Sequence, residues 1–276
     1  MKSNRHVPFP WSLLRFWTLR VLPAWFLLAL IIFLVQLAVC GIVHDNERVK
    51  AFIQYIDLLP SFFKAFIGGD ILQAGNISGL IAIGYQDPFV LLLYMLFGVG
   101  VPTALLAGEV KNGNMELILS RQVTKTQAYI CAGIITVAGM YALVLVMFSG
   151  TVVATGIYNF DQTVPLYPFF KVAICGGITA SAVGSIALFA AASFKRNNAL
   201  YITVAYLVLS YFVSIISEWW PRMKWLKPTT IFYYGPGPEI FNESAWPLGD
   251  MCVLLSILAV SSILGGIIWQ RRDLPL

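Results

Sequence analysis

Few residues in this 276-residue chain have both the type and the spacing that support chemistry. Its four cysteines lie inside long apolar runs, without C-x-x-C spacing: Cys40, Cys131, Cys175 and Cys252. The two histidines, His6 and His44, stand alone, so neither pairs with a cysteine to hold a metal. The cysteines are therefore interpreted as small apolar residues. The sequence predicts neither a metal site nor a catalytic one.

ATP binding by this chain is not expected either. The pattern G-x-x-x-x-G-K-[ST], whose backbone amides bind ATP phosphates, is absent from the sequence. No nucleophile–base pair or metal cluster stands out in the apolar segments, as an intramembrane enzyme would require. We therefore expect a chain that is not an enzyme and that binds no cofactor itself.

One stretch, residues 105–127, carries a pattern that predicts contact with another protein. It reads LLAGEVKNGNMELILSRQVTKTQ and turns near residues 112–114. Four aliphatic side chains then follow closely: Met115, Leu117, Ile118 and Leu119. Residues 120–125 are mostly polar. Aliphatic side chains that face water in a loop favour a protein partner over an ordinary connection.

The rest of the chain must position this stretch, and its composition indicates where. Apolar residues make up 59% of the chain and charged residues 11%, against roughly 25% charged in an ordinary soluble domain. Such a chain cannot cover a water-facing surface, so we expect it to be surrounded by membrane lipid. The net charge of +5 comes from basic residues at the ends of apolar segments rather than from a patch. No nucleic-acid partner is therefore expected.

Several segments are apolar over about the 20 residues that a helix needs to cross a bilayer. They are residues 21–43, 88–107, 128–157, 169–194, 199–217 and 251–269. Helix is required, because an open strand would leave unpaired amides in hydrocarbon. We predict an all-α, polytopic membrane protein with six transmembrane helices, in which residues 1–276 form a single transmembrane domain. Lys171, near the end of a span, is expected to reach outward.

Lysine and arginine near the span ends predict the orientation, since cytosolic loops are enriched in both. The bias places both termini in the cytosol and the protein in the cell inner (plasma) membrane. Residues 109–126 then form a cytosolic loop, and residues 44–87 and 218–250 lie outside. Residues 47–59 have the spacing of an amphipathic helix, which either caps the bundle or gates an exit path.

Residues 1–20 combine aromatic and basic side chains, including Trp11, Phe16, Trp17, Arg15 and Arg20. This mixture suits a helix in the cytosolic interface, where rings lie at headgroup depth and arginines reach phosphates. The segment is interpreted as an elbow helix before the first span or as an anchoring flank.

The predicted fourth span is rich in small residues at a spacing of four. One row is Gly176, Ala180 and Gly184, and the next is Gly177, Ser181 and Ser185. Such rows predict close contact with another helix, or less commonly a lining for substrate. Other polar residues either line a path or bond to their own helix: Gln36, Thr103, Ser149, Thr151 and Thr155.

The stretch after the second span resembles the corresponding loop of ABC-2 type permeases, which are six-span membrane subunits of ATP-binding-cassette exporters. The matching pattern is Glu109-x-x-x-Gly113-x-x-x-Leu117-x-Leu119-Ser120-Arg121, followed by Val123-Thr124-Lys125. The basic N-terminal elbow, the outer loop around residues 59–63 and the large segment before the last span agree in layout. The family commonly has proline where this chain has Gln122.

The resemblance implies an ABC-2 (type V exporter-like) permease fold and a role for this loop. Residues 112–125 would form a coupling helix, seated in a groove of a cytosolic ABC ATPase subunit that uses ATP and Mg²⁺. Apolar contact would come from Met115, Leu117, Ile118 and Leu119. Orientation would come from Glu109, Glu116, Arg121 and Lys125, with Gly113 and Thr124 completing the pattern. A second permease copy or a sibling permease would complete the exporter.

Other functions remain open at the level of sequence. An ion-coupled secondary transporter is disfavoured, because no pair of Asp, Glu or Lys stands out within the spans. Neither an internal repeat nor an enzyme-like site is evident. A non-transporting scaffold or immunity subunit would use the same fold to bind an ATPase. The pattern does not specify a cargo.

Overall fold

The computed structural model describes residues 9–45, 54, 77–160, 163–236, 240 and 246–273, and its regular structure there is helical. Six helical segments are long and apolar enough to cross a membrane. They are Trp11–Val43 (α1), Pro88–Lys111 (α6, η1 and α7), Lys125–Ile157 (α9), Leu166–Ser193 (α10), Arg196–Ser217 (within α11, Arg196–Trp219) and Leu248–Arg271 (α13). Over the described residues the structure is all-α, as predicted, and it has the six candidate transmembrane helices expected from the sequence. The chain is a multi-pass membrane protein by helix length and hydropathy.

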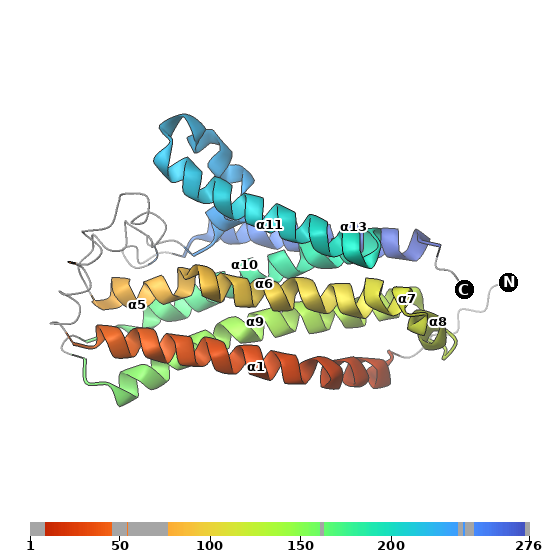
Figure 1. The fold of residues 1–276 in the computed structure, drawn as a ribbon, viewed down its shortest axis with the longest axis horizontal. Coiled ribbons are helices and arrows are strands. Elements are labelled where there is room, and N and C mark those ends of the chain that lie inside the picture. The colour runs from red at the N-terminus through yellow and green to blue at the C-terminus, as the bar shows by residue number, and fades with distance from the viewer. Residues whose placement is uncertain are drawn as a thin grey trace.

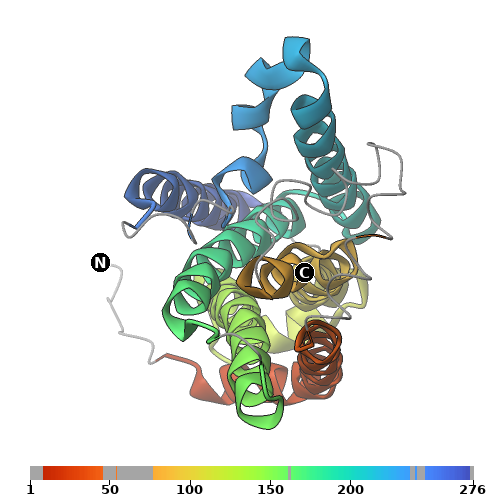
Figure 2. The ribbon, with the colours of Figure 1, turned by 90° about the vertical axis from the view of Figure 1, so that its left-hand side faces the viewer.

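The long helices lie side by side, with α10 in the middle (Figure 1). Helix α10 packs against α9, α13 and α6, and 72% of its most apolar window is buried. The corresponding window of α13 is only 11% buried. Helix α11 leans away from the other helices (Figure 2). The exposed side chains of α11 and α13 are largely apolar, including Leu209 and Ile263, as a surface in contact with lipid requires.

Helix α1 joins the predicted elbow and the first span in one helix of 33 residues. At 1.5 Å per residue this is about 50 Å, longer than the roughly 30 Å hydrocarbon core of a bilayer. Figure 2 shows the red N-terminal turns running across the bundle, at a steep angle to the later turns. Pro23 lies within the helix and bends it by removing a backbone hydrogen bond. The expected boundary between elbow and span is therefore a bend, not a break.

A further helix, α5 (Ile77–Gln86), precedes the second span and was not expected from the sequence. Ile77, Leu80 and Ile81 are buried, and α5 packs against α1. Asp87 then starts a new helix, because its carboxylate accepts hydrogen bonds from the Phe89 and Val90 amides at 2.8 and 3.4 Å. The amphipathic helix expected over residues 47–59 lies outside the described residues, Gln54 apart.

Two 3-10 helices follow α11 on the way to the last span. They are η2 (Pro221–Thr229) and η3 (Ile231–Tyr234). Helix η2 packs back on α11 and stands apart from the main bundle, on the half of the molecule away from both termini (Figure 1).

The small residues of α10 lie where it meets α9. A Cβ atom on Gly177 would lie 2.5 Å from the Tyr141 ring, and one on Gly184 would lie 3.0 Å from Thr136 Cγ2. The Ser181 hydroxyl donates to the carbonyl of Val137 at 3.4 Å. In the row that also contains Gly184, Ala180 is buried, and a Cβ on Gly176 would make only ordinary contact. The closest approach in the two rows is thus at Gly177.

Lys171, which was expected to reach toward the end of its span, is only 2% exposed. Its ammonium lies 5.1 Å from the ring centroid of Tyr167 and 5.8 Å from that of Trp246. The negative faces of these rings attract a cation. Tyr167 lies one turn nearer the start of α10, so the ammonium is held by aromatic rings toward that end of the helix.

Candidate functional site

The loop between α6 and α9 begins with a change of helix type. Pro102 is followed by a π-helical segment, η1 (Thr103–Gly108), and then by one short turn, α7 (Glu109–Lys111). Glu109 at the start of α7 is 3% exposed and forms an ion pair with Arg20 of α1. A buried carboxylate needs such a partner. The ion pair therefore fixes the start of the loop to the first helix.

The middle of the loop is a short helix, α8 (Asn114–Leu119), entered through a tight turn. Gly113 has φ +73°, in the left-handed region where glycine is favoured because it has no Cβ. Gln122 after the helix has φ +60°, whereas proline is fixed near −65°. This turn therefore differs from one built on the proline that the ABC-2 family commonly has here.

The four aliphatic residues of the loop are placed differently from one another. Leu117 is 67% exposed, whereas Met115 is 2% exposed and belongs to the main hydrophobic core. Ile118 and Leu119 are partly buried and pack against the same core. Of the four side chains that were expected to contact a partner, Leu117 is thus the most exposed. The other three hold α8 against the bundle.

The four charged residues that were expected to orient the loop also divide into two pairs. Glu116 and Arg121 are exposed near Leu117. Glu109 is buried against Arg20, and the Lys125 ammonium donates to the carbonyl of Arg272 at 2.8 Å. The second pair interacts within the chain, so of these four residues Glu116 and Arg121 are the more accessible to a partner.

The loop ends in a capping box that starts α9. The backbone N–H of Gln127 donates to Thr124 Oγ1 at 3.2 Å, and the backbone N–H of Thr124 donates to Gln127 Oε1 at 3.0 Å. These reciprocal bonds satisfy amides that a helix start leaves without a partner. Thr124 therefore has a structural role in this chain, apart from any contact with a partner.

A cluster at the end of α13, which the sequence analysis missed, holds this region together. We call Lys125, Trp269 and Arg272 the C-terminal clasp. The Trp269 indole donates to the carbonyl of Lys125 at 3.0 Å. Arg272 Nη1 lies 2.9, 3.1 and 3.3 Å from the carbonyls of Ala192, Phe194 and Ala191, at the end of α10. A cation is favourable at a helix C-terminus. The sequence signal was only a tryptophan and two arginines after an apolar run.

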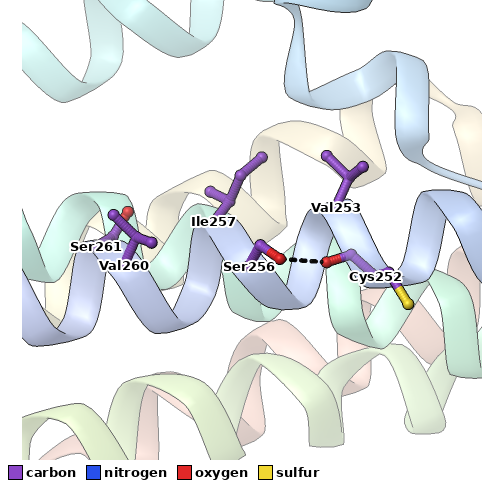
Figure 3. A pocket seen from close by; sticks show the side chains of 6 residues that line it. All are labelled: Cys252, Val253, Ser256, Ile257, Val260 and Ser261. Atoms are coloured by element: carbon purple, nitrogen blue, oxygen red, sulfur yellow. Dashed lines mark hydrogen bonds between the residues drawn. The ribbon is translucent and has the colours of Figure 1, made fainter.

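A groove of about 460 Å³ on α13 is a weaker candidate (Figure 3). It is lined by Cys252, Val253, Ser256, Ile257, Val260 and Ser261. The Ser256 hydroxyl donates to the carbonyl of Cys252 in its own helix at 2.7 Å, so it is not directed at a ligand. Among the described residues, no group of three or more His, Cys, Asp or Glu is placed to hold a metal.

A buried polar cluster joins α1, α5 and α9 inside the bundle. The Gln36 amide donates to Thr151 Oγ1 at 2.9 Å, and the Tyr85 hydroxyl lies 2.8 Å from the same oxygen. By contrast, Ser149 and Thr155 donate to carbonyls of their own helix. Thr103 Oγ1 and Gln36 Oε1 are buried and have no hydrogen-bond partner among the described residues. The cluster consists of neutral groups.

No protein-family model matches the sequence, and neither the curated proteins nor the solved structures give a match. The resemblance to ABC-2 permeases therefore rests on the loop residues and on the general layout of the chain.

Proposed function

We propose that this chain is the membrane-spanning subunit of an ABC-2 type exporter, and that α8 binds a separate cytosolic ABC ATPase. The observation that carries the proposal is Leu117, which is 67% exposed on a short helix fixed by its buried neighbours. An exposed apolar side chain on a well-held helix suits an interface, because little freedom is lost when a partner binds.

The surroundings of Leu117 support this assignment. Helix α8 lies at the end of the bundle where both termini lie (Figure 1), which the distribution of basic residues assigns to the cytosol. Glu116 and Arg121 are exposed close by in the sequence. An apolar centre with a polar rim is the usual composition of a protein interface.

In the proposed mechanism, the partner binds ATP and Mg²⁺, and its closure displaces α8. The ion pair between Arg20 and Glu109 passes this displacement to α1, and the C-terminal clasp passes it to α13. A second copy of this chain or a sibling permease supplies the other half of the exporter. Cargo then moves along the interface between the two halves.

An ion-coupled secondary transporter receives less support. Ion or proton coupling in membranes generally uses ionisable side chains within the spans. Among the described residues, the buried cluster around Thr151 contains an amide and hydroxyls. Two charged residues of the described spans are buried. Glu109 lies at the end of its span and is paired with Arg20, and Lys171 lies in the second turn of α10 against the rings of Tyr167 and Trp246.

The experiment is co-purification of the tagged, full-length chain from its native host in mild detergent. Wild type should retain an ATPase subunit, identified by mass spectrometry and by ATP hydrolysis. Leu117→Glu should lower the recovered ATPase about tenfold or more, as loss of a central interface side chain does. Leu119→Glu is not an informative variant, because Leu119 packs against the core.

A matched control keeps the added charge in the same loop. Asn112→Glu also introduces a carboxylate on an exposed residue but leaves Leu117 in place, so it should retain the ATPase. Equal recovery with Leu117→Glu and wild type would reject the assignment of α8. An ATPase that binds through Leu117 without ATP-dependent export in vesicles would identify a scaffold subunit instead.

A further inference from the structure

Helix η2 presents an unusual combination of side chains. It reads PRMKWLKPT and carries Arg222, Lys224, Lys227 and Trp225 in nine residues. Trp225 is 71% exposed, and Arg222 and Lys224 are exposed as well. No acidic residue occurs between Glu218 and Glu239 in the sequence. The segment is therefore strongly basic and aromatic at once.

The 3-10 geometry places these side chains in defined rows. With three residues per turn, side chains at i and i+3 lie above one another. Arg222 and Trp225 therefore share one row, and Lys224 and Lys227 share the next. A cation thus stands beside an exposed indole, and a second row of cations runs next to both.

Two of the three cations are available for an external anion. Neither Arg222 nor Lys224 has an ion pair or hydrogen-bond partner among the described residues. Lys227 is directed toward the ring of Tyr233, 5.8 Å from the ring centroid. The inference therefore rests on Arg222, Lys224 and Trp225.

The position of η2 in the chain sets its depth in the membrane. It begins two residues after the end of α11, whose exposed side chains include Leu209, Phe212 and Ile216. A helix that follows a lipid-facing span so closely lies near the headgroups, where tryptophan is favoured. In both views η2 stands clear of the central helices, so its exposed rows are not covered by them (Figures 1 and 2).

We propose that η2 binds the phosphate groups of anionic phospholipids at the membrane face opposite the chain termini. Arg222 and Lys224 contact the headgroup phosphates, and the Trp225 indole lies at the boundary with the acyl chains. Arginine matches phosphate oxygens through paired donors, and lysine contributes a compact charge. This surface is independent of the proposed ATPase contact, which lies at the other end of the bundle.

The test uses Trp225 as a local reporter in the full-length protein. Nanodiscs contain phosphatidylcholine and increasing fractions of phosphatidylglycerol, with bromine, a quencher of tryptophan, only on the phosphatidylglycerol chains. The difference in quenching between wild type and Trp225→Phe is the part due to Trp225. It reports anionic lipid beside residue 225. In wild type, the quenching of Trp225 should exceed the value expected if phosphatidylglycerol and phosphatidylcholine were distributed at random around the protein. In Arg222→Gln/Lys224→Gln, the preference for phosphatidylglycerol over phosphatidylcholine beside residue 225 should fall about thirtyfold, or about fivefold for each cation removed.

Three comparisons decide the outcome. Lys111→Gln/Lys195→Gln removes two exposed cations at the other end of the bundle and should leave the quenching unchanged. Bromine moved to phosphatidylcholine should quench Trp225 of the double variant, which shows that η2 still lies in lipid. Inorganic phosphate at millimolar concentration should not displace the lipid. Any one of three results would overturn the proposal. They are quenching in wild type that matches random lipid mixing, an unchanged preference for phosphatidylglycerol in Arg222→Gln/Lys224→Gln, and displacement of the lipid by free phosphate.

Discussion

The ion pair between Arg20 and Glu109 links the first helix to the start of the loop, and its two partners are unequally exposed. Glu109 is 3% exposed and Arg20 is 50% exposed. Arg20→Ala should destabilise the protein by about 1–3 kcal/mol, because a buried carboxylate loses its partner while the removed charge was half in solvent. Thermal unfolding in detergent should show an apparent melting temperature lower by several degrees.

Two further variants test whether charge is the cause. Arg15→Ala removes an exposed cation from the same helix and should leave the melting temperature nearly unchanged. Arg20→Ala/Glu109→Gln should recover part of the loss, since a neutral amide costs less to bury than a carboxylate. If the double variant were less stable than Arg20→Ala, the pair would not be the source of the effect.

For individual residues of the loop, the sequence predicted the kinds of side chain better than it predicted which of them are exposed. The aliphatic residues of α8 were recognised, but the sequence could not show which of them faces the bundle. A six-residue helix has fewer than two turns, so its pattern does not define a buried face. Met115 is buried because tertiary packing decides, and Glu109 is buried because Arg20, distant in the sequence, lies beside it.

The contact between α9 and α10 is sensitive to the addition of a single methyl group. A Cβ on Gly177 would lie 2.5 Å from the Tyr141 ring, whereas one on Gly176 would lie 3.5 Å from Val144. Gly177→Ala should therefore destabilise the bundle by about 1–3 kcal/mol through overpacking. Gly176→Ala, one residue away, should be neutral or slightly stabilising, because alanine favours helix over glycine. Equal melting temperatures of the two variants would contradict this contact.

The C-terminal clasp joins the beginning of α9 and the ends of α10 and α13. Arg272→Ala removes the guanidinium that contacts three carbonyls at the end of α10. We expect faster amide hydrogen exchange in the last turns of α10 and α13, because both ends fray more easily. Arg271→Ala removes the adjacent charge, which contacts none of these carbonyls, and should leave exchange unchanged. Slowed or unchanged exchange in Arg272→Ala would refute the clasp.

Long elements were predictable from the sequence, and short or tertiary ones were not. Five of the six predicted spans fall within a long helical segment, and the span 169–194 passes the end of its segment by one residue, because crossing a bilayer demands a long apolar run. Helix α5 has only 10 residues, too few to span, so its apolar run was assigned to a connection. The bend in α1 required knowledge of packing, although Pro23 marked a candidate position.

The described residues contain six candidate spans, and an even number of spans predicts that both termini and α8 lie on one side of the membrane. Impermeant maleimide applied to intact cells should therefore label Thr229→Cys but not Ser120→Cys, in a Cys252→Ser background. Position 252 is replaced because Cys252 is exposed. After permeabilisation, both should be labelled. Labelling of Ser120→Cys in intact cells would invert the orientation, and equal labelling of both positions would contradict the six-span topology.

The ties at the two ends of the loop have a mechanical consequence. One end is bound to α1 through Glu109, and the other to α13 through Lys125. The loop is therefore held at both ends, and a force applied to α8 is transmitted to both α1 and α13. Loss of one of these two contacts would not free the loop, but would let it rotate about the contact that remains.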